Sequence, residues 1–106
     1  MATFIRPISV GTTPILALAD NPRRSAWRVT MFSSAINAGN TGRVHIGRRV
    51  PPNTTVGEPT TGDILTQGGE ISESKSFPTE KIFTGEIWLT ASAASQLVNV
   101  EETIED

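Results

Sequence analysis

The chain has 106 residues, a length that suits one domain with a single hydrophobic core, and we treat 1–106 as that domain. It contains no cysteine, which excludes disulfide bonds, thiolate catalysis and cysteine-based metal sites. The apolar run at 15–19 is far shorter than the roughly 20 residues of a membrane-spanning helix. We therefore expect no membrane partner and no targeting segment.

The net charge of −2 conceals a division between two halves of the chain. Residues 1–53 carry seven arginines against one acid, which gives +6, and residues 54–106 carry two lysines against ten acids, which gives −8. Two interpretations are open. Interleaved strands would mix the two sets on one surface, whereas separate basic and acidic poles would favour head-to-tail contacts between copies.

The first segments in chain order are apolar and extended. Residues 3–10 include Pro7, which cannot donate to a β ladder, so we expect 1–10 to form either an extended arm or an edge strand. A short strand is predicted at 12–18. The sequence Asp20-Asn21-Pro22 predicts a turn, because Asn and Asp favour turn entry and proline fixes φ.

The clearest strand signal lies at residues 26–33. Apolar side chains such as Trp27 alternate with polar ones such as Arg28, a period of two that predicts one buried and one solvated face. Residues 34–42 are rich in small polar residues and predict a loop. The alternation returns at 43–47.

The prolines of residues 48–62 exclude a helix, and we expect a long surface loop there. The acidic residues 101–106 predict a tail that frays at its end. Further strands are predicted at 63–66, 70–76, 82–91 and 97–103.

Turn signals recur at about the 8–12-residue spacing that is typical of sandwiches and barrels. No apolar periodicity of a helix extends over three turns. The predicted fold is all-β: a single small antiparallel β-sandwich, jelly-roll-like, with an extended N-terminal arm and a C-terminal tail.

Catalytic chemistry has little support in this sequence. The single histidine, His45, stands between two apolar residues, which predicts a surface position on the polar face of a strand. One histidine with scattered carboxylates indicates neither a nucleophile–base pair nor a metal site. We expect no enzyme, no cofactor and no bound metal.

Two arginine doublets are the most prominent polar feature. Arg23 and Arg24 follow a predicted turn, and Arg48 and Arg49 precede a pair of prolines, so both doublets are expected at strand ends. Arginine pairs well with carboxylates at protein interfaces. Because the chain is acidic overall and has no tyrosine to stack on bases, we favour protein contact over nucleic acid, and simple solvation stays open.

Trp88 alternates out of phase with its apolar neighbours, so it either faces a partner or lies on a strand that is covered on both faces. The expected arm adds three further exposed candidates. The candidate protein-interface residues are Phe4, Ile5, Arg6, Arg23, Arg24, Arg48, Arg49 and Trp88.

Three stretches carry a resemblance to a known family. They are the turn Asn21-Pro22-Arg23-Arg24 that runs into a strand, the strand end Val44-His45-Ile46-Gly47, and the segment from Thr84 to Leu89 with Val98-Asn99-Val100-Glu101. In this order they are similar to segments of small β-sandwich virion proteins of tailed bacteriophages. The chain departs from that family at His45, where an aromatic residue is usual, and at Trp88, where a smaller aromatic is usual.

The resemblance implies a virion structural protein, in the first place a capsid decoration (cement) protein. Such a protein binds the outer capsid surface and stabilises contacts between major capsid subunits. The resemblance implies a location in the virion, with assembly in the host cytoplasm. The expected partners are the major capsid protein and further copies of this chain, as a dimer or trimer. The alternatives are a tail-, neck- or fibre-associated accessory protein of the same fold, and a carbohydrate- or nucleic-acid-binding sandwich.

Overall fold

The structure is a computed structural model that describes residues 2–52, 62–75, 77 and 80–105. In these ranges it shows eight β-strands and no helix, and consequently no helix that could cross a membrane. The strands are β1 (Ala2–Val10), β2 (Ile15–Leu18), β3 (Arg24–Met31), β4 (Val44–Arg48), β5 (Asp63–Leu65), β6 (Glu70–Ser74), β7 (Ile87–Ala91) and β8 (Gln96–Ile104).

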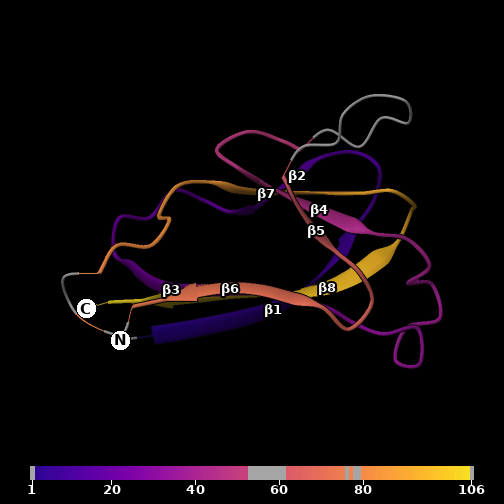
Figure 1. The fold of residues 1–106 in the computed structure, drawn as a ribbon, viewed down its shortest axis with the longest axis horizontal. Helices are drawn as coiled ribbons and strands as arrows, with labels where there is room; N and C mark the ends of the chain where they lie inside the picture. The colour runs from indigo at the N-terminus through magenta and orange to yellow at the C-terminus, as the bar shows by residue number, and fades with distance from the viewer. Residues whose placement is uncertain (1, 53–61, 76, 78–79, 106) are drawn as a thin grey trace.

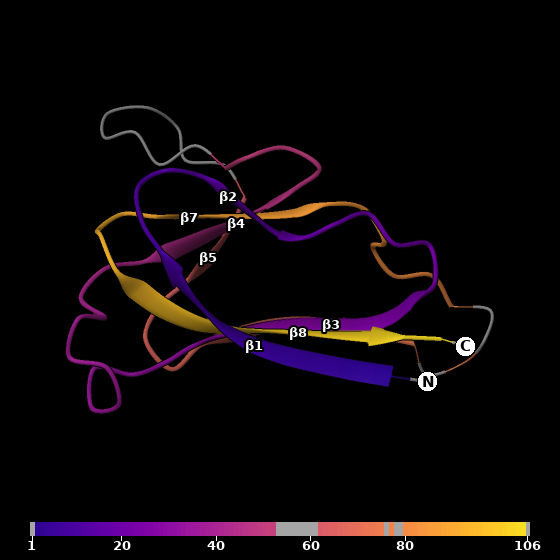
Figure 2. The ribbon, with the colours of Figure 1, turned by 180° about the vertical axis from the view of Figure 1, so that it is seen from behind.

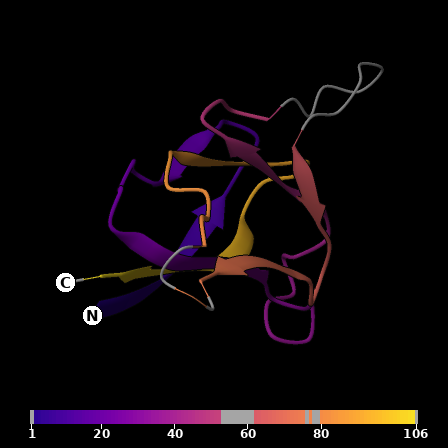
Figure 3. The ribbon, with the colours of Figure 1, turned by 60° about the vertical axis from the view of Figure 1, so that its left-hand side comes forward.

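The strands form two four-stranded antiparallel sheets that face each other (Figure 1, Figure 3). Sheet 1 has the order β1-β8-β3-β6, and sheet 2 has the order β2-β7-β4-β5. Strands pair from the ends of the chain inward: β1 with β8, β2 with β7, β3 with β6 and β4 with β5. This winding is that of a jelly roll, so the predicted all-β sandwich is confirmed.

One hydrophobic core lies between the sheets. The alternation read from the sequence places Trp27, Val29 and Met31 of β3 inward, where each is at most 1% exposed. β8 contributes Val98 and Val100 from the neighbouring strand of the same sheet. Sheet 2 closes the core with Leu18, Val44, Ile46, Leu65, Ile87, Leu89 and Ala91.

The expected N-terminal arm is a strand of the protein's own sheet. β1 pairs with β8 along its whole length, from Ala2 opposite Ile104 to Val10 opposite Gln96. Of the two alternatives for residues 1–10, the edge strand is therefore the one found for 2–10. The acidic tail is corrected for the same reason, because pairing with β1 continues β8 to Ile104; residues 1 and 106 lie outside the described ranges.

Two further expectations change at their boundaries. The strand predicted at 82–91 begins only at Ile87, and residues 80–86 are irregular. The carbonyls of Phe83 and Gly85 accept from the Arg24 side chain, and those of Thr84 and Glu86 accept from the backbone N–H groups of Asn21 and Arg49. In the loop predicted at 48–62, Arg48 belongs to β4, and 53–61 lie outside the described residues. Residue 76, the last of the strand predicted at 70–76, also lies outside them.

A buried arginine ties the two sheets together at the end of the sandwich where the chain termini lie (Figure 1). Arg24 is 0% exposed. Its Nε donates to Glu102 at 2.7 Å, its Nη2 donates to the carbonyl of Ala19 at 2.7 Å, and its Nη1 donates to the carbonyls of Phe83 at 3.2 Å and Gly85 at 2.9 Å. The acceptors belong to β8 and to the chain just after β2 and just before β7, so one side chain joins both sheets.

The opposite end of the sandwich is closed by two buried amides. Asn40 Nδ2 donates to the carbonyls of Phe32 and Leu97, and its Oδ1 accepts from the backbone N–H of Leu97. Gln96 Nε2 donates to the carbonyl of Gly39, and its Oε1 accepts from the backbone N–H of Gly42. The loop 32–42 is thereby fastened to the start of β8, and its buried backbone groups are satisfied.

Replacing Arg24 with alanine should lower the free energy of unfolding by about 3–5 kcal/mol, because Glu102 and three backbone carbonyls lose their donor inside the protein. The neighbouring Arg23 is exposed, and Arg23→Ala should change stability by less than about 0.5 kcal/mol. Urea denaturation followed by tryptophan fluorescence measures both variants. Equal losses in the two would show that Arg24 does not hold the sandwich together.

Candidate interaction surface

β1 presents the most exposed apolar side chains among the candidate residues. Phe4 is 58% exposed and Ile5 is 61% exposed, on opposite faces of an edge strand. Arg6 is held in place, since its Nη2 donates to the carbonyl of Ala17 on β2. A groove of about 360 Å³ runs between β1 and β2, lined by Phe4, Ile5, Arg6, Ala17, Leu18, Ala19, Val100 and Glu102.

The first arginine doublet divides between surface and interior. The Asn21 side chain accepts from the backbone N–H of Arg23, and the Asn21 carbonyl accepts from that of Arg24, which forms the predicted turn. Arg23 is exposed, as expected. The assignment of Arg24 to a protein interface is wrong, because the folded chain surrounds its guanidinium completely.

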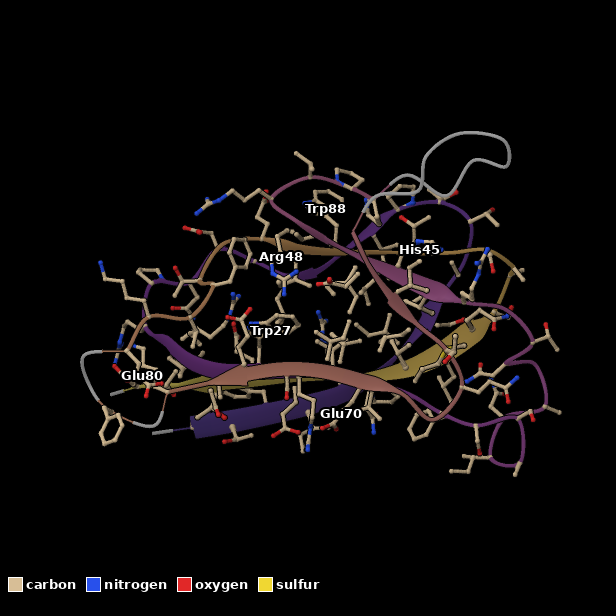
Figure 4. All side chains as sticks on the ribbon, in the orientation of Figure 1. Trp27, His45, Arg48, Glu70, Glu80 and Trp88 are labelled. Atoms are coloured by element: carbon tan, nitrogen blue, oxygen red, sulfur yellow. The ribbon has the colours of Figure 1, made fainter. Side chains whose placement is uncertain are left out.

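Arg48 closes the opposite edge of the sandwich, between β5 and β6. Its guanidinium forms ion pairs with Asp63 of β5 and Glu73 of β6 and stacks over the Trp27 ring at 5.4 Å (Figure 4). Burial lowers the pKa of Arg48, but the hydrogen bonds and charges of Asp63 and Glu73 outweigh this effect and raise it overall. Three internal partners thus hold a side chain that we expected to contact another protein.

Arg49 also has internal partners. Its backbone has a φ of 71°, and its N–H donates to the carbonyl of Glu86 at 2.8 Å. Its guanidinium lies over the Phe83 ring at 5.1 Å from the centroid. Arg24 and Arg49, one arginine from each doublet, therefore both hold the irregular segment before β7. The two doublets that are separate in the sequence thus contact the same segment in the fold.

Trp88 lies on the outer face of sheet 2 and is partly buried. In the sheet it stands between Leu16 of β2 and Gly47 of β4. The chain after β4 crosses over Gly47, where an added Cβ would meet the carbonyl oxygen of Val50 at 2.1 Å. The outer face of sheet 2 is therefore partly covered by its own chain, and not by the N-terminal segment.

His45 is a second correction. The alternation of β4 was interpreted correctly, since His45 lies on the outer face beside Thr90 and Ile64, but the side chain is 0% exposed rather than at the surface. β4 is buried from Val44 to Gly47. Sequence alternation assigns a face, and only the tertiary structure decides whether that face meets water.

The outer face of sheet 1 is polar and has its own charge cluster. Arg28 in the middle of β3 donates to Glu101 of β8 at 2.6 Å and lies 3.7 Å from Glu70 of β6. The hydrogen bond to Glu101, followed by the charge of Glu101, raises the pKa of Arg28. Figure 4 shows Glu70 on the side of β6 that faces away from sheet 2.

The ion pairs decide between the two interpretations of the charge division. Arg24, Arg28 and Arg48 come from the basic half, and each pairs with a carboxylate of the acidic half. The two sets of charges are therefore mixed within one domain. Among the remaining candidates, Arg23 is exposed, and Phe4 and Ile5 are exposed apolar side chains.

The candidate residues do not form one site. Phe4, Ile5 and Arg6 lie at the β1 edge of the sandwich, whereas Arg48 lies at the β5–β6 edge. Among the described residues, no group of three His, Asp or Glu side chains is placed to hold a metal ion. No protein-family model, curated protein or solved structure matches the chain.

The stacking of Arg48 on Trp27 can be tested by fluorescence. In a Trp88→Phe background, where Trp27 is the only indole, Arg48→Ala should make Trp27 more accessible to acrylamide quenching. It should also lower the free energy of unfolding by about 0.5–1 kcal/mol, the size of a partly exposed cation–π contact. Arg43→Ala, at an exposed position just before β4, is the control, and equal quenching in both variants would contradict the contact.

Proposed function

We propose that this chain is a structural protein of a tailed-bacteriophage virion, and specifically a capsid decoration protein. In this role it binds the outer surface of the capsid and stabilises contacts between major capsid subunits. The proposal rests on the resemblance of three sequence segments to small virion proteins and on where those segments lie in the fold.

The position of the resembling segments is the observation that carries the proposal. The turn at Asn21-Pro22 leads into β3, Val44–Gly47 is part of β4, and the last segment covers the start of β7 and the middle of β8. These four strands are the two central strands of each sheet. The similarity thus follows the framework of a jelly roll, a fold used in viral capsid and lectin domains, and the step from fold to function is an analogy.

The surfaces suit a protein that binds by many modest contacts. The outer face of sheet 1 is polar in its centre, where Arg28 already pairs with Glu70 and Glu101. Two exposed apolar side chains, Phe4 and Ile5, lie near the start of β1, and the other large ones lie elsewhere, at Leu16, Ile36, Val50, Ile64 and Phe77. On a capsid lattice, repeated copies gain avidity, so a small contact per copy is enough for stable decoration.

The first test is the copy number of the chain in purified particles, measured by quantitative mass spectrometry against the major capsid protein. A copy number equal to that of the major capsid protein, or to a simple fraction of it, is expected for decoration. A far lower number, matching a tail or neck component, would replace the head assignment with the accessory one. Absence from the particle would overturn the virion proposal and favour a free binding module.

A second expected outcome concerns particle stability. Particles produced without this chain should release their DNA at a lower temperature than complete particles, because contacts across neighbouring capsid subunits are missing. Adding back the purified protein should restore the temperature, which a DNA-binding dye follows during heating. An unchanged release temperature would remove the stabilising role even if the copy number is high.

A further inference from the structure

We propose that two copies of this chain pair through the free edge of β1, antiparallel, about a two-fold axis at Ile5. The interface would extend sheet 1 of one copy into sheet 1 of the other. This inference concerns the isolated protein, so it does not depend on the proposed virion function, and its test uses no particle.

The direction of the backbone groups of β1 follows from those of β8. The Leu97 carbonyl accepts from the backbone N–H of Phe32 and from Asn40 Nδ2, and its N–H donates to Asn40 Oδ1. The Thr103 carbonyl accepts from Ser25 Oγ. The backbone N–H and C=O groups of Leu97 and Thr103 therefore point away from β1. Because the direction of these groups alternates along a strand, those of the even-numbered residues between them point toward β1.

The same alternation assigns the free edge of β1. Residues paired with those even positions of β8, such as Phe4 and Arg6, direct their backbone groups at β8. The free edge therefore carries the backbone groups of Thr3, Ile5, Pro7 and Ser9. Pro7 lacks an N–H, and it stands where β8 needs no donor, which explains how a proline fits a fully paired strand.

β1 is the edge strand with the least protection against pairing. β2 has four residues and β5 three, and β6 carries Glu70 and Glu73 among its five residues. Short or charged edges discourage pairing with other chains. β1 has nine residues and exposes Phe4 and Ile5, and Figure 2 shows it along the border of sheet 1, where none of the described strands lies on its other side.

The free edge of β1 complements a second copy of itself. With the axis at Ile5, the N–H of each Ile5 faces the carbonyl of the other, and the N–H of each Thr3 faces the carbonyl of Pro7 in the other copy. Because Pro7 has no N–H, the Thr3 carbonyl of each copy is the one facing group in the paired stretch that receives no hydrogen bond from the other strand. An isologous two-fold contact of this kind closes on itself and gives a dimer.

Side chains favour this register over its neighbours. An axis at Ile5 sets Phe4 of one copy opposite Arg6 of the other, a favourable cation–π pair, and brings the two exposed Ile5 side chains together. An axis at Arg6 would oppose two arginines. An axis at Pro7 would oppose two residues without an N–H donor.

Sedimentation velocity of the purified full chain over a concentration series tests the inference. The wild type should form a species of twice the 11.4 kDa chain mass. Ile5→Pro removes the N–H at the axis without touching the bonds to β8, and should weaken the dimer about tenfold or more. Ser9→Pro removes an N–H from the same edge outside the paired stretch 2–8, and should leave the dimer intact.

Two further measurements keep the result independent of folding defects. Ile5→Lys, which opposes two ammonium groups at the axis, should also weaken the dimer, and circular dichroism should show an unchanged fold in all variants. Hydrogen exchange of the Thr3 and Ile5 amides should slow as concentration rises, while the Phe4 and Arg6 amides stay protected throughout. A monomer up to about 1 mM, a trimer, or equal effects of Ile5→Pro and Ser9→Pro would each overturn the inference.

Discussion

The fold depends on a positive charge that has no contact with water. Arg24 is completely enclosed, and transferring a guanidinium from water into a protein costs several kcal/mol unless its donors are satisfied. Here the acceptors are one carboxylate and three carbonyls that come from three separate segments of the chain. The charge is satisfied only when β3, β8, the end of β2 and the approach to β7 are all in place. Closing the open end of the sandwich is therefore a cooperative event, in which a partly assembled end leaves a buried cation short of partners.

The jelly-roll winding explains why the two halves of the chain have opposite charges. Strands pair from the ends of the chain inward, so strands of the basic half lie beside strands of the acidic half. Arg28 on β3 stands between Glu101 on β8 and Glu70 on β6, which is a direct consequence of that order. A division that looks like two poles along the sequence becomes local pairing in space. Exposed pairs of this type add little stability individually, but like charges in the same places would oppose the register of sheet 1.

Local patterns in the sequence predicted much of this fold, and long-range contacts account for the rest. The alternation around Trp27 located β3 and its inner face, and the turn at Asn21 placed its start, because both are properties of consecutive residues. The interior position of Arg24 could not be read in this way, since its partners lie up to 78 residues away in the chain. His45 shows the same limit: its face was assigned correctly, but alternation along β4 could not show that both faces of this strand are buried. Of the candidate interface residues, Phe4, Ile5 and Arg23 have the exposure that the sequence pattern suggested, whereas Arg24 is enclosed.

An exposed edge strand favours aggregation, because any extended chain can add to it. Most of the edges in this sandwich are short or charged, and the exception, β1, carries a proline at one of the positions whose backbone faces outward. A proline there does not close the edge; it makes the edge selective. A partner strand whose register requires an N–H donor at position 7 loses a hydrogen bond, whereas one that uses only the Pro7 carbonyl as an acceptor loses none. A proline would disrupt a central strand, but at an edge it can determine the register in which another strand pairs. An edge that pairs with a second copy of itself is then covered, and it no longer exposes free backbone groups to other chains.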